Sequence, residues 1–379
     1  MARLAQIIGL IVFGVGIAVA IMLLVFRDPA LRYTLTNALA PCTIAPGDWE
    51  DAATLATGMT VTLTPCIGFT YKDEPDPEFR NFIVYNNFGF HDDDFTFDKP
   101  QDTYRILLLG DSFAQGNEVV QSAGFPDLIE KALDADSQQR VEVVNLGLQT
   151  LNTGGELLLY TALGWRFDAD LVMLAFYPGN DVLDNYFANR MLTLDDSGAL
   201  VMYEAETQLD PARFPDSTAY QWLIDQQAGA DPDVLVFESL GRGDELGLYL
   251  PDDAAWSAAW RLTEALVLQL RDLVQAQGSD FAVVIIPDRR AIYRDYQAVI
   301  LRDAPDLAPQ MDFVQPHRRA WKIFTDAGIP TLDLQPILSQ WAGNHPGTHI
   351  YYRQDGHFNP DGHALVAEQI LHWLPSPPP

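Results

Sequence analysis

The sequence predicts an α/β fold, a three-layer α/β/α domain built on a five-stranded parallel sheet. Apolar runs of strand length recur from residue 105 onward, and amphipathic stretches of helix length separate them. Runs that are apolar throughout are typical of strands buried on both faces, and their alternation with helices is typical of a parallel sheet. The expected strands are 105–109, 141–145, 170–176, 281–286 and 329–333.

Helices are expected between these strands and after the last one. The amphipathic stretches lie near 122–135, 154–164, 256–277 and 313–327. Trp256 and Trp260 fit the buried side of the third stretch, with carbohydrate stacking as the alternative interpretation. The final helix is easy to delimit because Asn359 can cap it and Pro360 suits its first position.

The chain divides into four expected segments. Residues 1–27 form a membrane anchor, because the apolar run from Ile7 to Phe26 has roughly the ~20 residues that span a bilayer. A cleavable signal peptide has a shorter apolar region, so an uncleaved anchor is favoured. The other expected segments are a connecting arm at 28–100 packed on the main domain, the α/β domain at 101–374 and a Pro-rich tail at 375–379.

The regular alternation breaks once, in an acidic, Gly-rich insertion at about 184–255. An insertion at the carboxyl edge of a sheet often forms a lid or a wall of the substrate site. A surface loop without such a role is the alternative. The sequence leaves both interpretations open.

Two observations bear on the compartment and on possible partners. Cys42 and Cys66, the only cysteines, follow the anchor in a Pro-rich region, which suits a disulfide in an oxidising compartment, although two unpaired cysteines fit the sequence as well. We therefore expect a single-pass membrane protein whose main domain is extracytoplasmic. The formal net charge of −29 argues against a nucleic-acid partner, because phosphate binding needs clustered Lys and Arg.

Ser112 is the candidate nucleophile. The first strand stops at Gly110-Asp111-Ser112, and the carboxyl edge of an open α/β sheet is where such folds gather their chemistry. A serine nucleophile needs a base and donors that stabilise the oxyanion on the attacked carbonyl. The expected donors are the amides of Ser112 and Gly147 and the carboxamide of Asn180, because they follow the first, second and third strands.

The expected base is His357, just ahead of the final helix. Asp355 lies two residues earlier, and in an extended segment such positions point to one side, so its carboxylate can reach Nδ1 and leave Nε2 to accept the serine proton. The following helix opposes imidazolium formation, whereas Asp355 favours it. Asp355, His357 and His363 lack a further His or Cys ligand at a recognisable spacing, so neither a metal nor an organic cofactor is expected.

Four blocks in this order closely resemble the SGNH, or GDSL-type, serine esterase family. The blocks are Gly110-Asp111-Ser112, Asn145-Leu146-Gly147, Gly179-Asn180-Asp181 and Asp355-Gly356-His357. The resemblance covers roughly residues 82–374 and implies a flavodoxin-like α/β/α sandwich. It also implies that Ser112 is the nucleophile of a triad completed by His357 and Asp355. Gly147 and Asn180 would then complete the oxyanion hole with the Ser112 amide.

Two departures from the family pattern bear on the reaction. Pro178 stands where the family usually has Gly, and only Gly356 separates Asp355 from His357, where two intervening residues are usual. The short spacing is similar to that of SGNH-like polysaccharide O-acetyltransferases.

We expect an esterase that hydrolyses an acyl ester, O-acetyl or short-chain, through an acyl-enzyme. The ester would belong to a small molecule or a glycan. One alternative is transfer of the acyl group to a cell-envelope glycan. Another is a non-catalytic module that binds a glycan or a partner protein. The sequence indicates no oligomeric state.

Overall fold

The computed structural model describes residues 67–71 and 78–374, apart from 138, 188–189 and most of 204–242. The predicted anchor at 1–27, Cys42 and Cys66, the tail at 375–379 and most of the predicted insertion lie outside the described residues. Within the part that is described, no helix combines the length and the apolar character that a bilayer crossing requires.

The centre of the molecule is a five-stranded parallel sheet, which confirms the predicted fold class. Numbered along the chain, the sheet strands lie side by side in the order 2-1-3-4-5, which is the flavodoxin-like order. All four neighbouring pairs are parallel. In spatial order the strands are β4 (Arg140–Asn145), β3 (Thr103–Gly110), β5 (Leu171–Phe176), β8 (Asp280–Ile285) and β9 (Thr331–Asp333).

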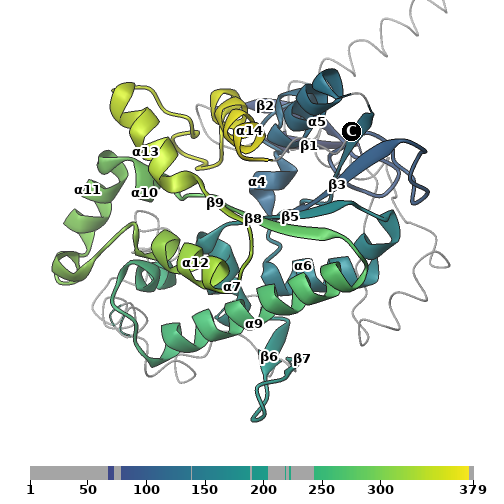
Figure 1. Cartoon of the computed structure of the whole chain (residues 1–379). Coiled ribbons are helices and arrows are strands. Elements are labelled where there is room, and N and C mark those ends of the chain that lie inside the picture. Colours follow the sequence, from purple (N-terminus) through teal and green to yellow (C-terminus); the bar gives the residue numbers. More distant parts are fainter. Residues whose placement is uncertain are drawn as a thin grey trace, which may run out of the picture.

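Helices cover both faces of this sheet (Figure 1). One face carries α4 (Ser112–Gln115), α5 (Phe125–Asp136), α10 (Arg289–Ile292), α13 (Leu334–Asn344) and α14 (Pro360–Trp373). The other face carries α6 (Thr153–Ala162), α7 (Pro178–Tyr186), α9 (Ala254–Ala276) and α12 (Gln315–Asp326). The described chain also contains α11 (Arg294–Asp303) and two antiparallel hairpins, β1 (Ile67–Tyr71) with β2 (Arg80–Val84) and β6 (Leu192–Leu194) with β7 (Leu200–Met202).

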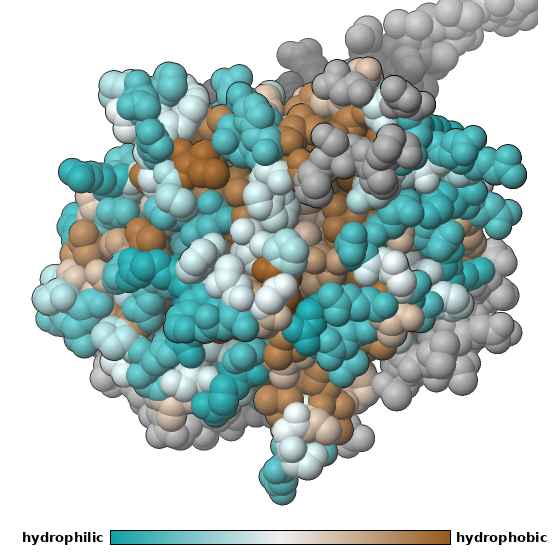
Figure 2. Space-filling model, in the orientation of Figure 1, coloured by the Kyte–Doolittle hydropathy of each residue, from teal (hydrophilic) through white to brown (hydrophobic). Residues whose placement is uncertain are grey.

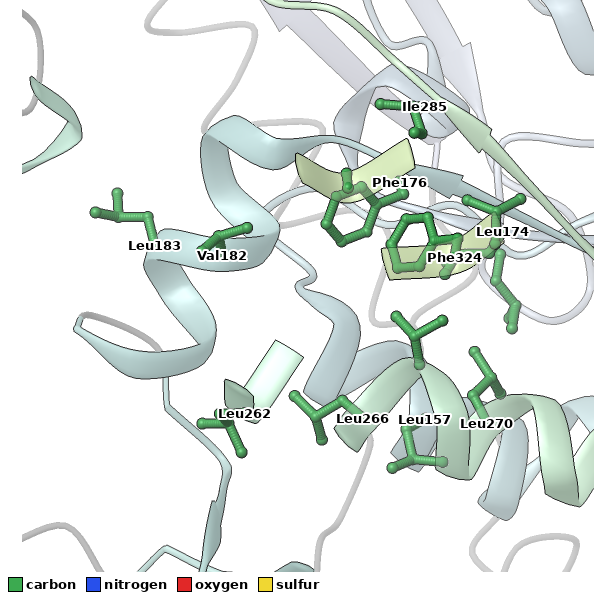
Figure 3. Close-up of a cluster of buried hydrophobic side chains, with 14 of the residues drawn as sticks. Leu157, Leu174, Phe176, Val182, Leu183, Leu262, Leu266, Leu270, Ile285 and Phe324 are labelled. Carbon is green, nitrogen blue, oxygen red and sulfur yellow. The ribbon is translucent and has the colours of Figure 1, made fainter. Parts of the chain in front are cut away.

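The sheet separates two hydrophobic clusters. Leu107 and Leu109 of β3 pack into the cluster under α6 and α9, whereas Ile106 and Leu108 pack into the cluster under α5 and α14. This alternation follows from the two-residue period of a strand. Figure 3 shows the first cluster, in which the rings of Phe176 and Phe324 meet edge to face with centroids 5.0 Å apart. Hydrophilic residues cover much of the outer surface (Figure 2).

The segment before β3 is joined to the sheet through a buried arginine. Arg105 is fully buried, its Nε donates to Glu142 Oε2 at 2.6 Å, and its Nη1 donates to the carbonyls of Phe97 and Phe167. Phe90 and Phe95, which precede β3, are also buried in the cluster under α6. Phe90 and Phe95 therefore anchor this segment in the core.

Replacing Arg105 with Leu leaves the partly buried Glu142 carboxylate and two carbonyls without their donor. We expect a loss of about 3–5 kcal/mol in the free energy of unfolding, measured by denaturant titration. Arg140→Leu is the control, because Arg140 is exposed and its Nη2 lies 3.7 Å from the same carboxylate. The free energy of unfolding of Arg140→Leu should fall by less than about 1 kcal/mol. Equal losses would contradict this role for Arg105.

Candidate active site

The candidate nucleophile sits where β3 turns into α4. Asp111 caps this helix, because its Oδ1 accepts a hydrogen bond from Phe113 N at 2.9 Å. A Cβ at Gly110 would lie 2.7 Å from the Ala114 Cβ, so glycine permits the helix to fold back tightly over the strand end. Ser112 is the first residue of α4 and is therefore presented at the carboxyl edge of the sheet.

The structure brings the three predicted triad residues together. Ser112 Oγ lies 2.7 Å from His357 Nε2, although 245 positions separate the two residues. On the other side of the ring, His357 Nδ1 lies 2.5 Å from Asp355 Oδ1. A carboxylate can only accept, so Nδ1 carries the proton and Nε2 faces the serine. This arrangement can remove the serine proton during attack on a carbonyl carbon.

The loop that supplies His357 is not extended, so that part of the prediction is wrong. Tyr351 and Phe358 form an antiparallel bridge, and the chain must reverse between them. Gly356 makes the reversal with φ of +95°, a conformation that other residues rarely adopt. The carboxylate reaches the ring through this turn, since Asp355 Oδ1 also accepts from His357 N at 3.1 Å.

Two side chains that the sequence analysis missed hold this loop from opposite sides. The Glu78 carboxylate accepts from three successive amides, those of Arg353 (2.5 Å), Gln354 (2.7 Å) and Asp355 (3.1 Å). Arg289 Nη1 donates to three successive carbonyls, those of Tyr352 (3.4 Å), Arg353 (2.7 Å) and Gln354 (3.4 Å). No local pattern marks Glu78, because its partners lie more than 270 positions away.

The predicted oxyanion donors lie close to α4, but two of them already have protein acceptors. Gly147 N donates to Asn145 Oδ1 at 2.9 Å, and a Cβ at Gly147 would lie 2.6 Å from Gln115 N. Asn180, in the first turn of α7, donates from Nδ2 to Leu151 O at 3.1 Å. Their oxyanion role therefore stays a prediction.

Ser112 and His357 open onto a cavity of about 420 Å³. Its wall includes a charged cluster in which Arg290 pairs with Asp288 (2.7 Å) and Glu245 (2.6 Å). Glu245 comes from the predicted insertion. Burial raises the pKa of Asp288, but Arg290 and the Tyr177 hydroxyl outweigh it and lower that pKa to about 2. The remaining lining residues are Phe113, Gln149, Thr150, Asn180, Asp184, Arg289, Tyr296, Val299, Ile300, Asp355 and Gly356.

His357 binds its proton unusually tightly. Burial lowers its pKa, but the hydrogen bond to Asp355 and the charges of Glu118, Asp355 and Asp111 outweigh burial and raise the pKa to about 9. Burial raises the pKa of Asp111 to about 7, although the charge of His357 acts in the opposite direction. The resting site therefore favours the imidazolium form at neutral pH.

Two further carboxyl groups are fully buried in this region. Burial, together with the charge of Asp111, raises the pKa of Asp181 and of Glu156 well above their usual values. Asp181 joins two segments of the site, because Oδ1 accepts from Thr153 Oγ1 at 2.9 Å and Oδ2 accepts from Tyr177 N at 2.7 Å.

One group of side chains in the described part of the chain has ligand atoms close enough for a metal ion. It consists of Glu118, Asp355 and His357, so it overlaps the triad. Its imidazole nitrogen, Nδ1, already donates to Asp355. His363, considered with these residues above, is buried and its Nδ1 accepts from Phe125 N at 3.2 Å.

The predicted core residues Trp256 and Trp260 are both buried, as expected.

Comparisons with known proteins agree with this site. Residues 246–377 match the family model described as SGNH hydrolase-like domain, acetyltransferase AlgX. The matched segment contains Asp355 and His357. Ser112 lies before the segment and is not part of the match. No curated protein matches the chain.

The chain is also similar to several solved structures. One is a mutant of Axe2, an acetyl-xylooligosaccharide esterase from Geobacillus Stearmophilus, with 12% identity, coverage of 72% of this chain and 97% of that chain, and a TM-score of 0.41. Another is a lipase/acylhydrolase from Enterococcus faecalis, with 15% identity, coverage of 71% and 94%, and a TM-score of 0.36. A third is TesA, with 14% identity, coverage of 71% and 97%, and a TM-score of 0.38.

The sheet order and the Ser112–His357–Asp355 geometry define a serine-centred α/β protein. Its segment 246–377 is similar to an SGNH hydrolase-like domain.

The reactivity of Ser112 should rise with pH through about 9, because His357 accepts a proton only in its neutral form and its pKa is raised to about 9. The measurement is the rate at which a fluorophosphonate labels Ser112, with Ser112→Ala as the blank. A rate that is already constant from pH 7 upward would contradict the raised pKa.

Glu78→Ala should slow this labelling by about tenfold to a hundredfold, because a loop displaced by about 1 Å misaligns the ring. Glu368→Ala, an exposed change on α14, is the control. Labelling as fast as in the control would show that the Glu78 contact is dispensable.

Proposed function

We propose that the chain is an esterase in which Ser112 attacks the acyl carbon of an O-acetyl or short-chain ester, forms an acyl-enzyme and passes the acyl group to water. One observation carries the proposal. The Ser112 hydroxyl lies 2.7 Å from the imidazole of His357 and opens onto the cavity, while Asp355 holds the other side of the ring. This is the arrangement that serine acyl transfer requires.

The steps follow from the positions of these groups. As Ser112 Oγ bonds to the acyl carbon, its proton moves to His357 Nε2, and the imidazolium is stabilised by Asp355. The oxyanion faces the Ser112 amide, with Gly147 and Asn180 as the further proposed donors. His357 then returns the proton to the departing alcohol. A water molecule repeats the sequence on the acyl-enzyme and restores the free serine.

The cavity supports a small acyl group joined to a polar alcohol. Its volume of about 420 Å³ lies within the ~300–1,000 Å³ of small-molecule sites. Charged and hydroxyl side chains such as Asp288, Arg290 and Tyr177 form much of its wall, and they offer hydrogen bonds to a hydroxyl-rich substrate such as a glycan.

Acyl transfer to a glycan hydroxyl is the second candidate. The matching family model is described as an acetyltransferase, and the Asp355-Gly356-His357 spacing is similar to that of O-acetyltransferases of this type. The acyl-enzyme is common to both reactions. They differ only in whether water or a sugar hydroxyl removes the acyl group.

We also propose a place for the protein in the cell. Residues 1–27 would anchor it in a membrane, with the α/β domain on the extracytoplasmic side. The support is the apolar run from Ile7 to Phe26 and the pair of cysteines that follows it.

Hydrolysis is tested with a chromogenic acetyl ester, with and without candidate sugar acceptors. Wild-type protein should release the chromophore in water alone, and Ser112→Ala should reduce turnover by about a thousandfold or more. Ser197→Ala, an exposed change in the β6–β7 hairpin, should leave turnover unchanged.

Turnover that requires an acceptor, with acetylated sugar as the product, would replace hydrolysis by the transferase. Equal turnover by wild type and Ser112→Ala under both conditions would remove the enzymatic proposal. A non-catalytic binding module would then be the better interpretation.

A further inference from the structure

His357 Nδ1 faces two carboxylates. Asp355 Oδ1 lies 2.5 Å from this nitrogen, and Glu118 Oε1 lies 3.5 Å from it. Glu118 belongs to the segment that follows α4, so it approaches the ring from the nucleophile's side of the site. The approach depends on Gly116, whose φ of +64° ends α4 and turns the chain.

Glu118 is an acid in an unusual setting. Its side chain is only 8% exposed, and its Oε2 is buried with no hydrogen-bond partner in the described part of the chain. Across the same residues, His357 is the single basic group within ion-pair distance of it. A buried carboxylate is costly unless a charge or a donor compensates it. Glu118 is therefore best satisfied when His357 is protonated.

The other polar groups around the ring do not replace Glu118. Asp355 and Asp111 act on His357 with the same sign, and His363 on α14 is neutral because burial lowers its pKa to about 3. Arg289 is directed to the loop carbonyls and stacks on Tyr296. The hydroxyls of Tyr352 and Tyr85 lie near Glu118, and their raised pKa values keep them neutral.

We propose that Glu118 is a positioning residue that acts through His357, where its carboxylate stabilises the protonated ring that forms when Ser112 attacks. The catalytic consequence rests on the proposed acyl-enzyme chemistry. The effect on the ring does not, because it exists in the resting protein. Together with Asp355 and Asp111, Glu118 thereby raises the pH range in which the site reacts.

This role gives a distinctive pH dependence. Below the midpoint, the ring is protonated both in the resting protein and in the transition state. Removing Glu118 therefore leaves the free-energy difference between these two states, and hence the rate, unchanged. Above the midpoint, only the transition state carries the imidazolium, so removing Glu118 slows the reaction. The midpoint and the high-pH rate should therefore fall together, the rate by at most tenfold for each unit of the midpoint.

The test is Glu118→Gln, which keeps the shape of the side chain and removes its charge. In the full-length chain labelled at histidine Cε1, the NMR titration midpoint of His357 should fall by about one unit or more. The resonance is assigned by its absence from His357→Asn. The fluorophosphonate labelling midpoint should shift by the same amount, and the rates below both midpoints should coincide.

Glu130→Gln is the matched control. Glu130 is a partly buried acid that accepts from Val143 N at 2.7 Å and is not among the groups that act on His357, so its removal should leave the midpoint in place. Glu118→Asp keeps the charge, so the titration midpoint of His357 should stay close to the wild-type value. This variant provides the measurement if Glu118→Gln does not fold. Unchanged midpoints in a folded Glu118→Gln would overturn the proposal. Because the NMR midpoint needs no turnover, a failed esterase assay would not be mistaken for this outcome.

Discussion

The site depends on one constraint, that the loop 351–358 is held against the carboxyl edge of the sheet. Ser112 is placed by the end of β3, but its base comes from this loop, 245 positions later in the chain. The Tyr351–Phe358 bridge closes the loop. Glu78 binds its amides and Arg289 binds its carbonyls, so both polar sides of its backbone are satisfied by distant residues. The ring orientation follows from that support.

Electrostatic compensation divides the acids of the site into two groups. Asp288 lies against Arg290, and this buried pair is charged and fixed in the cavity wall. Among the described residues, the positive charge that acts on Asp111 and Glu118 is that of His357. Protonation of the imidazole thus stabilises the carboxylate forms of both buried acids. At neutral pH the resting protein already holds this charge, because the pKa of His357 is raised to about 9.

Much of the fold could be predicted because buried parallel strands leave a clear trace in a sequence. The five apolar runs became the five sheet strands, although β9 is shorter than its run and covers Thr331–Asp333. The helices α7, α10, α11 and α13 were missed. Of these, α7 and α13 begin within two residues of a strand end, at Pro178 and Leu334, so the apolar positions of helix and strand merge into one pattern. Asn180 consequently lies in a helical turn.

The sequence by itself determined which chemical groups are available and in what order, because short motifs such as Gly110-Asp111-Ser112 and Asp355-Gly356-His357 are local. The tertiary structure decided how they meet. The contacts that Glu78 and Glu118 make with the His357 loop are absent from any local pattern. They arise because packing places segments far apart in the chain within hydrogen-bonding distance, and local sequence does not encode that distance.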